Sequence, residues 1–394
     1  MSEKALDLRT LLLVYIGMLP APIGSAAFIT LIPAFKHYFS SPIEIMALAV
    51  TIYMIFFGTF QLFSGMLSDI YGRKYFVIAG LLFYAIGSLV MITAPDVLYL
   101  IIGRAVQGVG DGLMNPIYLA LIGDVSTEEN RGKLISIYST LVISGNTAGA
   151  FFGGLLGEVN WKYLYIFVGL LAFVMFFAYI ALLNQKSVKK ASRTVREHIS
   201  IMKDILKQKG VIALIIGAFL LTTVRSSFLT FLSDTLGSPP VLFSDYEIGL
   251  VFTFLGVVTI MAGPVMGVLV KKISEKSTLI LGGVSMMIGL SIIITSSSWV
   301  LYIFVLAAFY GVGYMFFYSV LNSLAIELVP EYKGSVSSLF NAFFFFGFAF
   351  GPIALLNIYL WQHLQGVVAI DILIVAINLL VVLIAIKMRR RTKR

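Results

Sequence analysis

Long apolar runs, separated by short polar or charged segments, follow one another along almost the whole chain. Two examples are residues 81–93 (LLFYAIGSLVMIT) and 367–386 (VVAIDILIVAINLLVVLIAI), which are too long and too apolar for the helices of a soluble core. A helix needs about 20 apolar residues to cross a bilayer, and the runs lack the alternation of membrane β-barrel strands. The pattern therefore predicts an all-α protein embedded in a lipid bilayer.

Charge clusters and turn residues divide the apolar sequence into twelve predicted transmembrane spans. Lys4 and Arg9, followed by an apolar stretch, resemble a secretory signal peptide, whose apolar core is short. Here the apolar sequence continues to Phe35, and we interpret it as an uncleaved first span. The predicted boundaries are 10–35, 44–64, 75–94, 98–124, 134–157, 163–184, 211–235, 246–270, 277–296, 300–326, 334–358 and 367–387.

Basic residues are concentrated in alternate connections between these spans. If both termini are cytoplasmic, the cytoplasmic segments contain 24 of the 28 Lys and Arg residues, with eight of them in 185–210 and six in 387–394. Cytoplasmic loops of membrane proteins carry such an excess of positive charge. We therefore expect a cell (inner) membrane protein with both termini in the cytoplasm, and the net charge of +9 needs no nucleic-acid partner.

The segment 185–210 separates two halves, 1–184 and 211–394, that repeat each other in sequence. Two of the matches at an offset of 202 residues are Arg131-Gly132 with Lys333-Gly334, and Gly145-x-x-x-Gly149 with Gly347-x-x-x-Gly351. We interpret the halves as two pseudo-equivalent six-helix bundles joined by a basic cytoplasmic linker. Paired bundles of this kind are an architecture of secondary transporters, which bind substrate near the bilayer midplane between the repeats.

One connection, between spans 2 and 3, contains an unusual concentration of charge. Its sequence, Gly65-x-x-Ser68-Asp69-x-x-Gly72-Arg73-Lys74, resembles the signature of the major facilitator superfamily, and the resemblance in spans and repeats covers essentially the whole chain. We expect Gly65 to let two helices approach closely and Gly72 to permit a sharp turn. Asp69, at a helix end, can receive backbone N–H groups or the positive end of a neighbouring helix. Arg73 can form a bidentate pair with a carboxylate, and Asp124 is the nearest candidate.

The resemblance implies a role for these charges in alternating access. In the family, the equivalent residues lock the two halves together on the inside while the cavity faces out, and we assign that role to Asp69, Arg73 and Asp124. The alternative is that the charges only set the orientation in the membrane. In the second half Lys271 stands where Asp69 would be, so a lock of this kind would be asymmetric.

Two further patterns resemble one branch of the superfamily, the drug:proton antiporters. GRAVQGVG in span 4 is similar to the Arg-x-x-Gln-Gly-x-Gly pattern of proton-coupled members. GNTAGAFFGG in span 5 is similar to the antiporter signature Gly-x-x-x-Gly-Pro-x-x-Gly-Gly, with Ala150 in place of its proline. Glycines also serve plain helix packing, and that alternative stays open. The glycines and proline concerned in spans 5 and 11 are Gly145, Gly149, Gly153, Gly154, Gly347, Gly351 and Pro352.

Polar residues in span 4 recur at helical spacing and therefore share one face. They are Arg104, Gln107, Gly108, Asp111, Asn115 and Tyr118. Asp111 lies near the middle of the span, where a charge is costly and is a functional candidate. The alternative is a buried ion pair that only holds helices together.

The second half supplies a possible counterpart to this stripe. At an offset of 203 residues, Gln107, Asp111 and Asn115 correspond to three tyrosines in span 10, whose apolar rings and polar tips suit a cavity wall or a plain core. These are Tyr310, Tyr314 and Tyr318. Arg225 in span 7 lies near the depth of Asp111, and the family arranges spans 1, 4, 7 and 10 around its cavity, so we expect Arg225 to pair or compete with Asp111.

Asp111 is the main candidate for binding a coupled proton. Many relatives carry an acid in span 1 at the position where this chain has Ile29. Asp371 is a second candidate, for which we expect a position at the rim of span 12.

Other classes of function lack their characteristic residues. Cysteine is absent and the three histidines are far apart in sequence, so we expect no metal site and no cofactor. There is no nucleophile–base pair and no Gly-x-x-x-x-Gly-Lys-Ser/Thr phosphate loop, which argues against an enzyme or an ATPase. We expect a monomeric, proton-coupled exporter of small amphipathic molecules or drugs. An importer or uniporter of sugars or organic acids is the alternative, because the cavity would hold two arginines against one aspartate.

Overall fold

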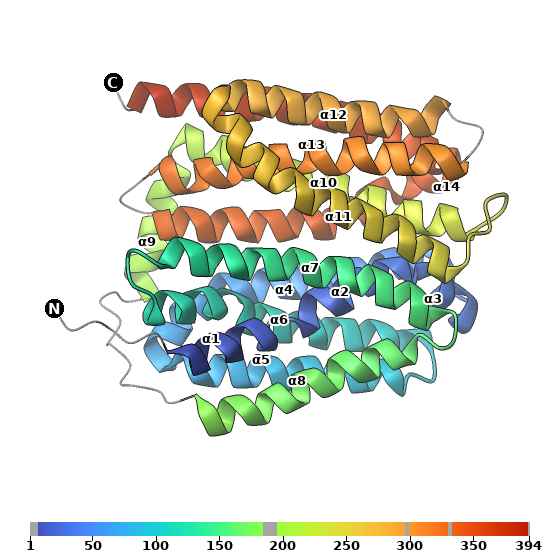
Figure 1. Ribbon diagram of the computed structural model, residues 1–394, viewed down its shortest axis with the longest axis horizontal. Coiled ribbons are helices and arrows are strands. Elements are labelled where there is room, and N and C mark those ends of the chain that lie inside the picture. The colour runs from blue at the N-terminus through green and yellow to red at the C-terminus, as the bar shows by residue number, and fades with distance from the viewer. Residues whose placement is uncertain (1–6, 184–194, 296–298, 330–332, 393–394) are drawn as a thin grey trace. The chain divides into compact units, whose positions relative to one another are not determined.

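The computed structural model describes residues 7–183, 195–295, 299–329 and 333–392, and within these ranges the regular structure is helical, without β-strands. The chain divides into two compact units, Met1–Arg193 and Thr194–Arg394, which we call unit 1 and unit 2. Figure 1 shows the helices of each unit running mainly along one direction. The prediction of an all-α membrane protein is confirmed.

The described part of unit 1, residues 7–183, contains eight helical segments, several of which correspond closely to predicted spans. They are α1 (Leu8–Gly17), α2 (Pro20–Thr30), α3 (Ile32–Phe39), α4 (Ile43–Tyr71), α5 (Arg73–Ile92), α6 (Val97–Val125), α7 (Arg131–Gly157) and α8 (Lys162–Leu182). Unit 2 contains the remaining described helices. They are α9 (Val195–Leu206), α10 (Lys209–Gly237), α11 (Asp245–Lys272), α12 (Glu275–Thr295), α13 (Trp299–Glu327) and α14 (Lys333–Thr392).

The predicted first span, 10–35, is interrupted rather than continuous. Helix α1 ends at Gly17 and α2 begins at Pro20, because proline lacks the N–H that a continuous helix would bond to the preceding turn. At this break the carbonyl of Gly17 accepts a hydrogen bond of 2.8 Å from the Tyr118 hydroxyl of α6. A second break at Leu31 separates α2 from α3.

Eleven helical stretches of the described residues are long and apolar enough to cross a membrane, where twelve were predicted. The difference lies in α14, whose apolar stretch Val336–Met388 has 53 residues. At 1.5 Å per residue a straight helix of this length would reach about 80 Å, well beyond a hydrocarbon core of about 30 Å. His363 interrupts the stretch with a φ of 55° and a ψ of −159°, so two helices meet there, as the spans predicted on either side require.

The two units share one pattern of helix pairing. In unit 1, α6 packs on α4 and α5, while α2 packs on α7 and α5 on α8. In unit 2, α13 packs on α11 and α12, while α10 and α12 both pack on α14. Since α14 contains two spans, the pairs of unit 2 repeat those of unit 1 in the same order. The sequence repeat is therefore also a repeat of structure.

Glycines bring the paired helices close together. A Cβ added at Gly149 of α7 would lie less than 3.0 Å from backbone atoms of Ile23 in α2. A Cβ added at Gly351 of α14 would meet the backbone of Thr223 in α10 in the same way. Both glycines therefore have a packing role, at equivalent places in the two units.

Candidate functional site

The charged connection between α4 and α5 is reduced to one residue, Gly72. Helix α4 continues to Tyr71, seven residues beyond the predicted end of span 2, and α5 begins at Arg73. Gly72 has a φ of 106°, which favours glycine because it has no side chain to clash. The sharp turn expected at Gly72 is present, and it places the charged residues on the ends of two helices.

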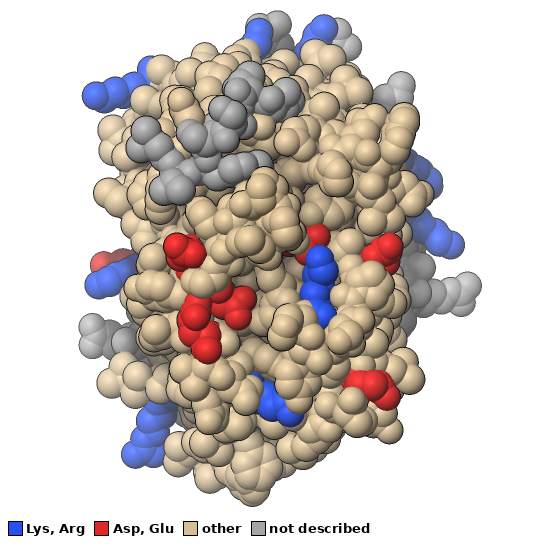
Figure 2. Space-filling view, turned by 90° about the vertical axis from the view of Figure 1, so that its right-hand side faces the viewer, with Lys and Arg blue, Asp and Glu red and all other residues tan. Residues whose placement is uncertain are grey.

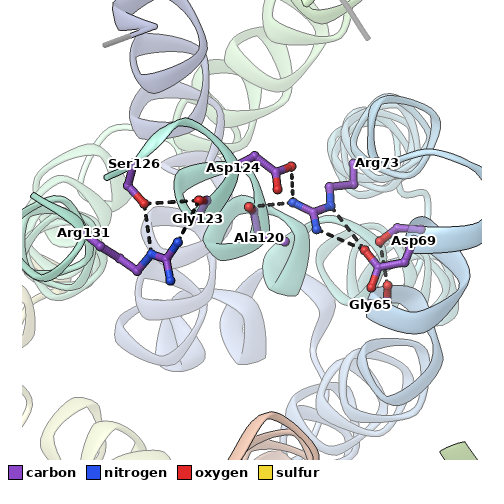
Figure 3. Close-up of polar contacts among 9 residues, drawn as sticks. Gly65, Asp69, Arg73, Ala120, Gly123, Asp124, Ser126 and Arg131 are labelled. Atoms are coloured by element: carbon purple, nitrogen blue, oxygen red, sulfur yellow. Dashed lines mark hydrogen bonds and ion pairs between the residues drawn. The ribbon is translucent and has the colours of Figure 1, made fainter. Parts of the chain in front are cut away.

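Arg73, the first residue of α5, binds both carboxylates that were assigned to the lock (Figure 3). Its Nε and Nη2 donate to Oδ1 of Asp69 at 3.3 and 3.1 Å. Its Nη1 donates to Oδ2 of Asp124 and to the carbonyl of Ala120 at 2.6 Å, near the end of α6. The guanidinium therefore places two nitrogens on one oxygen of Asp69 and bridges α4, α5 and α6 within unit 1.

This cluster lies at the surface of unit 1. The side chain of Arg73 is 25% exposed, and those of Asp69 and Asp124 are 51% and 54% exposed. Exposed ion pairs of this kind contribute about 0.2–1 kcal/mol each to stability, so the fold does not depend on them. The close helix approach expected at Gly65 is not found here, because an added Cβ would meet nothing within 4 Å. The side chain of Lys271 lies outside the described residues.

Two more basic residues at this end bind the carboxyl ends of helices. Nζ of Lys74 donates to the carbonyls of Ile180 and Leu183, each at 2.8 Å, at the end of α8. Arg131 donates through Nη2 to the Gly123 carbonyl at 3.3 Å, at the end of α6 (Figure 3). Cations are favourable at helix C-termini because they complete the last carbonyls and complement the helix dipole. Lys74 and Arg131 are thus helix caps.

The opposite end of the helices, where α3 lies, has a different charge distribution. Figure 2 shows this face, on which acidic side chains stand out and basic ones are sparse. The contrast agrees with the concentration of Lys and Arg in alternate connections. The orientation in the membrane stays a prediction.

In the middle of unit 1, the Asp111 side chain of α6 is held by a chain of hydroxyl groups. The hydroxyl of Tyr53 in α4 donates to Oδ2 of Asp111 at 2.7 Å, and Oγ of Ser25 in α2 donates to the Tyr53 oxygen at 2.8 Å. Asp111 is 5% exposed and Tyr53 is fully buried. Three helices therefore contribute to the surroundings of one carboxyl group.

Arg104, two turns before Asp111 on α6, uses the same tyrosine in another way. Its guanidinium lies 3.8 Å from the ring centroid of Tyr53 and 4.4 Å from that of Phe28. Nη1 donates to Oε1 of Gln107 at 3.1 Å, and Gln107 in turn donates to Ser88 of α5 at 2.9 Å. The cation–π contacts and the amide stabilise a charge that is 1% exposed.

Tyr53 thus contacts both buried charges of α6, one through its ring and one through its hydroxyl. Oδ1 of Asp111 and Nε of Arg104 are buried and have no hydrogen-bond partner among the described residues. Unpaired polar atoms in a buried site are costly. This arrangement can therefore gain from binding a proton or a polar group of a ligand.

The remaining members of the predicted stripe have different surroundings. Gly108 lies against α4, because an added Cβ would meet the backbone of Tyr53. Asn115 is partly buried, one turn beyond Asp111. Tyr118 is 1% exposed and fills the break between α1 and α2. The structure brings Arg104, Gln107 and Asp111 into one network and gives Tyr118 a contact of its own.

In unit 2, Arg225 of α10 lies over an aromatic ring of α13. Its guanidinium carbon is 4.1 Å from the ring centroid of Tyr314, and Nη1 is buried without a partner among the described residues. Tyr314 stacks on Tyr318 with ring centroids 6.1 Å apart, and Tyr310 packs on Phe228 at 4.6 Å. The three tyrosines and Arg225 thus gather on facing sides of α10 and α13. The pairing of Arg225 with Asp111 stays a prediction.

The structure corrects the expected position of Asp371. We expected this residue near the rim of span 12, but its side chain is fully buried between α14 and α10. The helix resumes directly after His363, so Asp371 lies about two turns inside it. Oγ of Ser227 donates to its Oδ1 at 3.0 Å.

Two features of these sites were missed in the sequence. Tyr53 and Ser25 belong to other helices than Asp111, and nothing in their own spans marks them. The second is a polar stripe on α10, visible at positions i, i+4, i+7 and i+11, that parallels the stripe of span 4. Its members are Thr223, Ser227, Thr230 and Asp234, all at most 4% exposed.

Comparison with known proteins gives relatives that include an MFS-type transporter and a drug resistance protein. The chain is 33% identical over 139 residues to the uncharacterized MFS-type transporter YwfA of Bacillus subtilis (strain 168), covering 34% of this chain and 32% of that protein. It is 27% identical over 222 residues to the quinolone resistance protein NorB of Staphylococcus aureus (strain MSSA476), covering 53% and 45%. The chain thus matches about a third of the first relative and less than half of the second.

A solved structure shows the same fold over the whole chain. It is the inward-facing, unoccupied form of a bacterial homolog to the human lysosomal transporter Spinster, with a TM-score of 0.78, 15% sequence identity and coverage of 99% of both chains. The family model of the Major Facilitator Superfamily matches residues 14–244 and 214–394. With its apolar helices, its repeated halves and these matches, the chain belongs to the Major Facilitator Superfamily, a family of membrane transporters.

Proposed function

We propose that this transporter exports small amphipathic molecules in exchange for protons, by alternating access. The observation that carries the proposal is Asp111, a carboxyl group buried in the middle of a transmembrane helix with one oxygen bound by Tyr53 and the other unpartnered among the described residues. A carboxyl group in such a place can alternate between a neutral and a charged form. The resemblance to a quinolone resistance protein supports export and drug-like substrates.

Coupling requires that proton binding and conformation depend on each other. A proton shifts a conformational equilibrium only if it binds one conformation more tightly than the other. Tyr53 offers such a difference, because a movement of α4 against α6 would break its bond to Asp111 and shift its ring from Arg104. Proton release and the opening of the cavity are then linked through one side chain.

The Arg73 cluster has a separate role in this proposal. Asp69 and Asp124 are about half exposed and Arg73 holds them together on the predicted cytoplasmic side. Surface charges of this kind bias an equilibrium between conformations by a few kcal/mol at most. We assign them to the inward/outward equilibrium and not to substrate binding.

Two arginines, Arg104, which is buried, and Arg225, which is partly buried, indicate the charge of the substrate. Arg104 and Arg225 each stack on aromatic rings, and among the described residues neither forms an ion pair with a carboxylate. A substrate with an anionic group and an apolar body would complement the surroundings of either arginine. The same observation favours the alternative, an importer or uniporter of organic acids, and a fluoroquinolone carries the carboxylate that either function needs.

The test is transport of norfloxacin into proteoliposomes with an imposed pH gradient, with protein-free liposomes as the blank. An antiporter accumulates norfloxacin when the interior is acidic, whereas a proton-coupled importer does so when the exterior is acidic. Asp111→Asn should abolish this accumulation and retain exchange of norfloxacin between the two sides. Asp96→Asn is the matched control, because Asp96 is an exposed N-cap of the same helix and asparagine caps equally well. Gradient-driven accumulation by Asp111→Asn would show that Asp111 is structural.

A further inference from the structure

Unit 2 contains a buried carboxyl group of its own, which the proposed function does not use. The side chain of Asp371 in α14 is fully buried, and its hydrogen-bond donor is Oγ of Ser227 in α10, at 3.0 Å from Oδ1 and 3.3 Å from Oδ2. Among the described residues no Lys or Arg nitrogen lies within the 4.0 Å of an ion pair. Among the described residues, this carboxyl group is therefore stabilised by one hydrogen-bond donor, a serine hydroxyl.

A charged carboxylate is unfavourable at this place. Burial of an ionised group costs several kcal/mol unless a counter-ion and further hydrogen bonds compensate for lost water. A single hydroxyl compensates for a small part of that cost. These surroundings therefore favour the neutral acid over the carboxylate at Asp371, and a conformation in which water or a cation reached the group would favour loss of the proton.

The polar face of α10 leads from Asp371 toward one end of unit 2. Ser227, Thr230 and Asp234 follow at i, i+3 and i+7, and they are therefore on the same side of the helix. Thr230 is fully buried and its hydroxyl has no partner among the described residues. Asp234 lies about 10 Å from Ser227 along the helix axis. Its Oδ2 accepts a hydrogen bond of 2.7 Å from the hydroxyl of Tyr359. Buried hydroxyl and carboxyl groups thus line a path to the last turn of α10.

Of the other helices packed on α14, α13 adds one group that responds to the charge of Asp371. Tyr310 of α13 is fully buried with an unpartnered hydroxyl, and it interacts electrostatically with both Asp371 and Arg225. The charged residues of α12, Glu275 and Lys276, lie in the first turn of that helix. Arg225 is therefore the cation that a charged Asp371 would attract, through or around Tyr310.

We propose that Asp371, with Ser227, is a second proton-binding site, reached along the polar face of α10. A proton converts the carboxylate to the neutral acid and leaves again as the negative charge returns, while no other bond changes. Together with Asp111, the site gives the transporter one exchangeable proton in each unit. This inference rests on the proposed proton exchange for its role in transport, whereas proton binding itself does not depend on it.

Proton binding can be measured on the purified protein by infrared difference spectroscopy between pH values. Each buried carboxylic acid gives a carbonyl band that shifts in D₂O and disappears when the proton leaves. We expect at least two such bands, one lost in Asp111→Asn and a second lost in Asp371→Asn, while a band of the buried Asp234 would be present in both variants. Ser227→Ala should shift the second band and preserve it, so the test holds even if Asp371→Asn folds poorly. A spectrum of Asp371→Asn equal to that of the wild type would overturn the proposal, as would a second band that stays constant at every pH.

The number of transported protons gives an independent test in proteoliposomes with the membrane potential clamped at zero. At equilibrium, a gradient of one pH unit supports an accumulation of norfloxacin of about 100-fold with two protons and about tenfold with one, since each proton contributes about 1.4 kcal/mol. The wild type should approach the first value and Asp371→Asn the second. A wild type at about tenfold would overturn the second transported proton and leave the proposed antiport intact. No accumulation by the wild type would overturn the antiport, and the infrared bands would still decide whether Asp371 binds a proton.

Discussion

Replacing Gly149 by alanine tests the closest helix contact of unit 1. The added Cβ would lie less than 3.0 Å from the carbonyl oxygen, the carbonyl carbon and the Cα of Ile23 in α2. These are backbone atoms, so no side chain can rotate away, and α7 must move from α2. Gly132, on the same helix, is the matched control, because an added Cβ there meets nothing within 4 Å.

Two opposing effects set the magnitude. Alanine stabilises a helix relative to glycine by about 0.5–1 kcal/mol, while overpacking costs about 1–3 kcal/mol. The clash involves three backbone atoms, which places Gly149→Ala toward the upper end of that range. We expect a net loss of about 1–2 kcal/mol for Gly149→Ala and no loss for Gly132→Ala.

The assay is thermal unfolding in detergent, followed by the fluorescence of Trp161 in a background where the other two tryptophans, Trp299 and Trp361, are replaced by phenylalanine. This tryptophan is 3% exposed and packs against Phe35 and Tyr165, so it reports on unit 1. A domain of 150–250 residues loses about 2–4 °C in Tm per kcal/mol, which gives a decrease of about 2–8 °C for Gly149→Ala. Equal melting temperatures for Gly149→Ala, Gly132→Ala and the wild type would refute the reasoning, because the helices would then adapt to the methyl group without cost.

Further substitutions at three places in unit 1 separate function from stability. Asp69→Asn and Arg73→Ala should abolish transport while lowering the free energy of unfolding by at most about 1 kcal/mol per ion pair. Full transport by both variants, at normal amounts in the membrane, would contradict the lock. Tyr53→Phe keeps the ring under Arg104 and removes the hydrogen-bond donor to Asp111. Gradient-driven transport should therefore fall, and the free energy of unfolding should decrease by about 1–3 kcal/mol. Tyr165→Phe, which loses a bond to the Gly24 carbonyl, should transport normally, and equal transport by the two variants would exclude a role for the Tyr53 hydroxyl. Lys74→Ala should lower the free energy of unfolding by about 0.3–1 kcal/mol, because the end of α8 loses its cap, and Lys74→Arg should not lower it. Calorimetry of the two variants and the wild type measures this difference.

The sequence predicted the helices well because burial in lipid imposes a length and a composition on each span. It did not locate their ends, since the polar segment around Asp69 is helical up to Tyr71 and only Gly72 interrupts the helices. Asp371 was misplaced for a similar reason. Its depth depends on where the helix resumes after His363, and the hydropathy pattern does not contain that information.

Sites within one helix were easier to predict than contacts between helices. The helical period is enough to place Arg104, Gln107 and Asp111 on one face of α6. Their partner Tyr53 depends on the rotation and register of α4 against α6, which glycines such as Gly108 set by close contact. Such a register is a property of packing, and one sequence does not reveal it.

The basic residues that cap α6 and α8 have a consequence for how the protein is made. During insertion into the membrane, Lys74 and Arg131 are positive charges next to emerging apolar segments, and such charges set which side each segment faces. Once the helices have packed, the same residues hold the carbonyls of Ile180, Leu183 and Gly123. A neutral substitution would therefore affect biogenesis and folded structure at once, and low yield of such a variant would not by itself identify which step had failed.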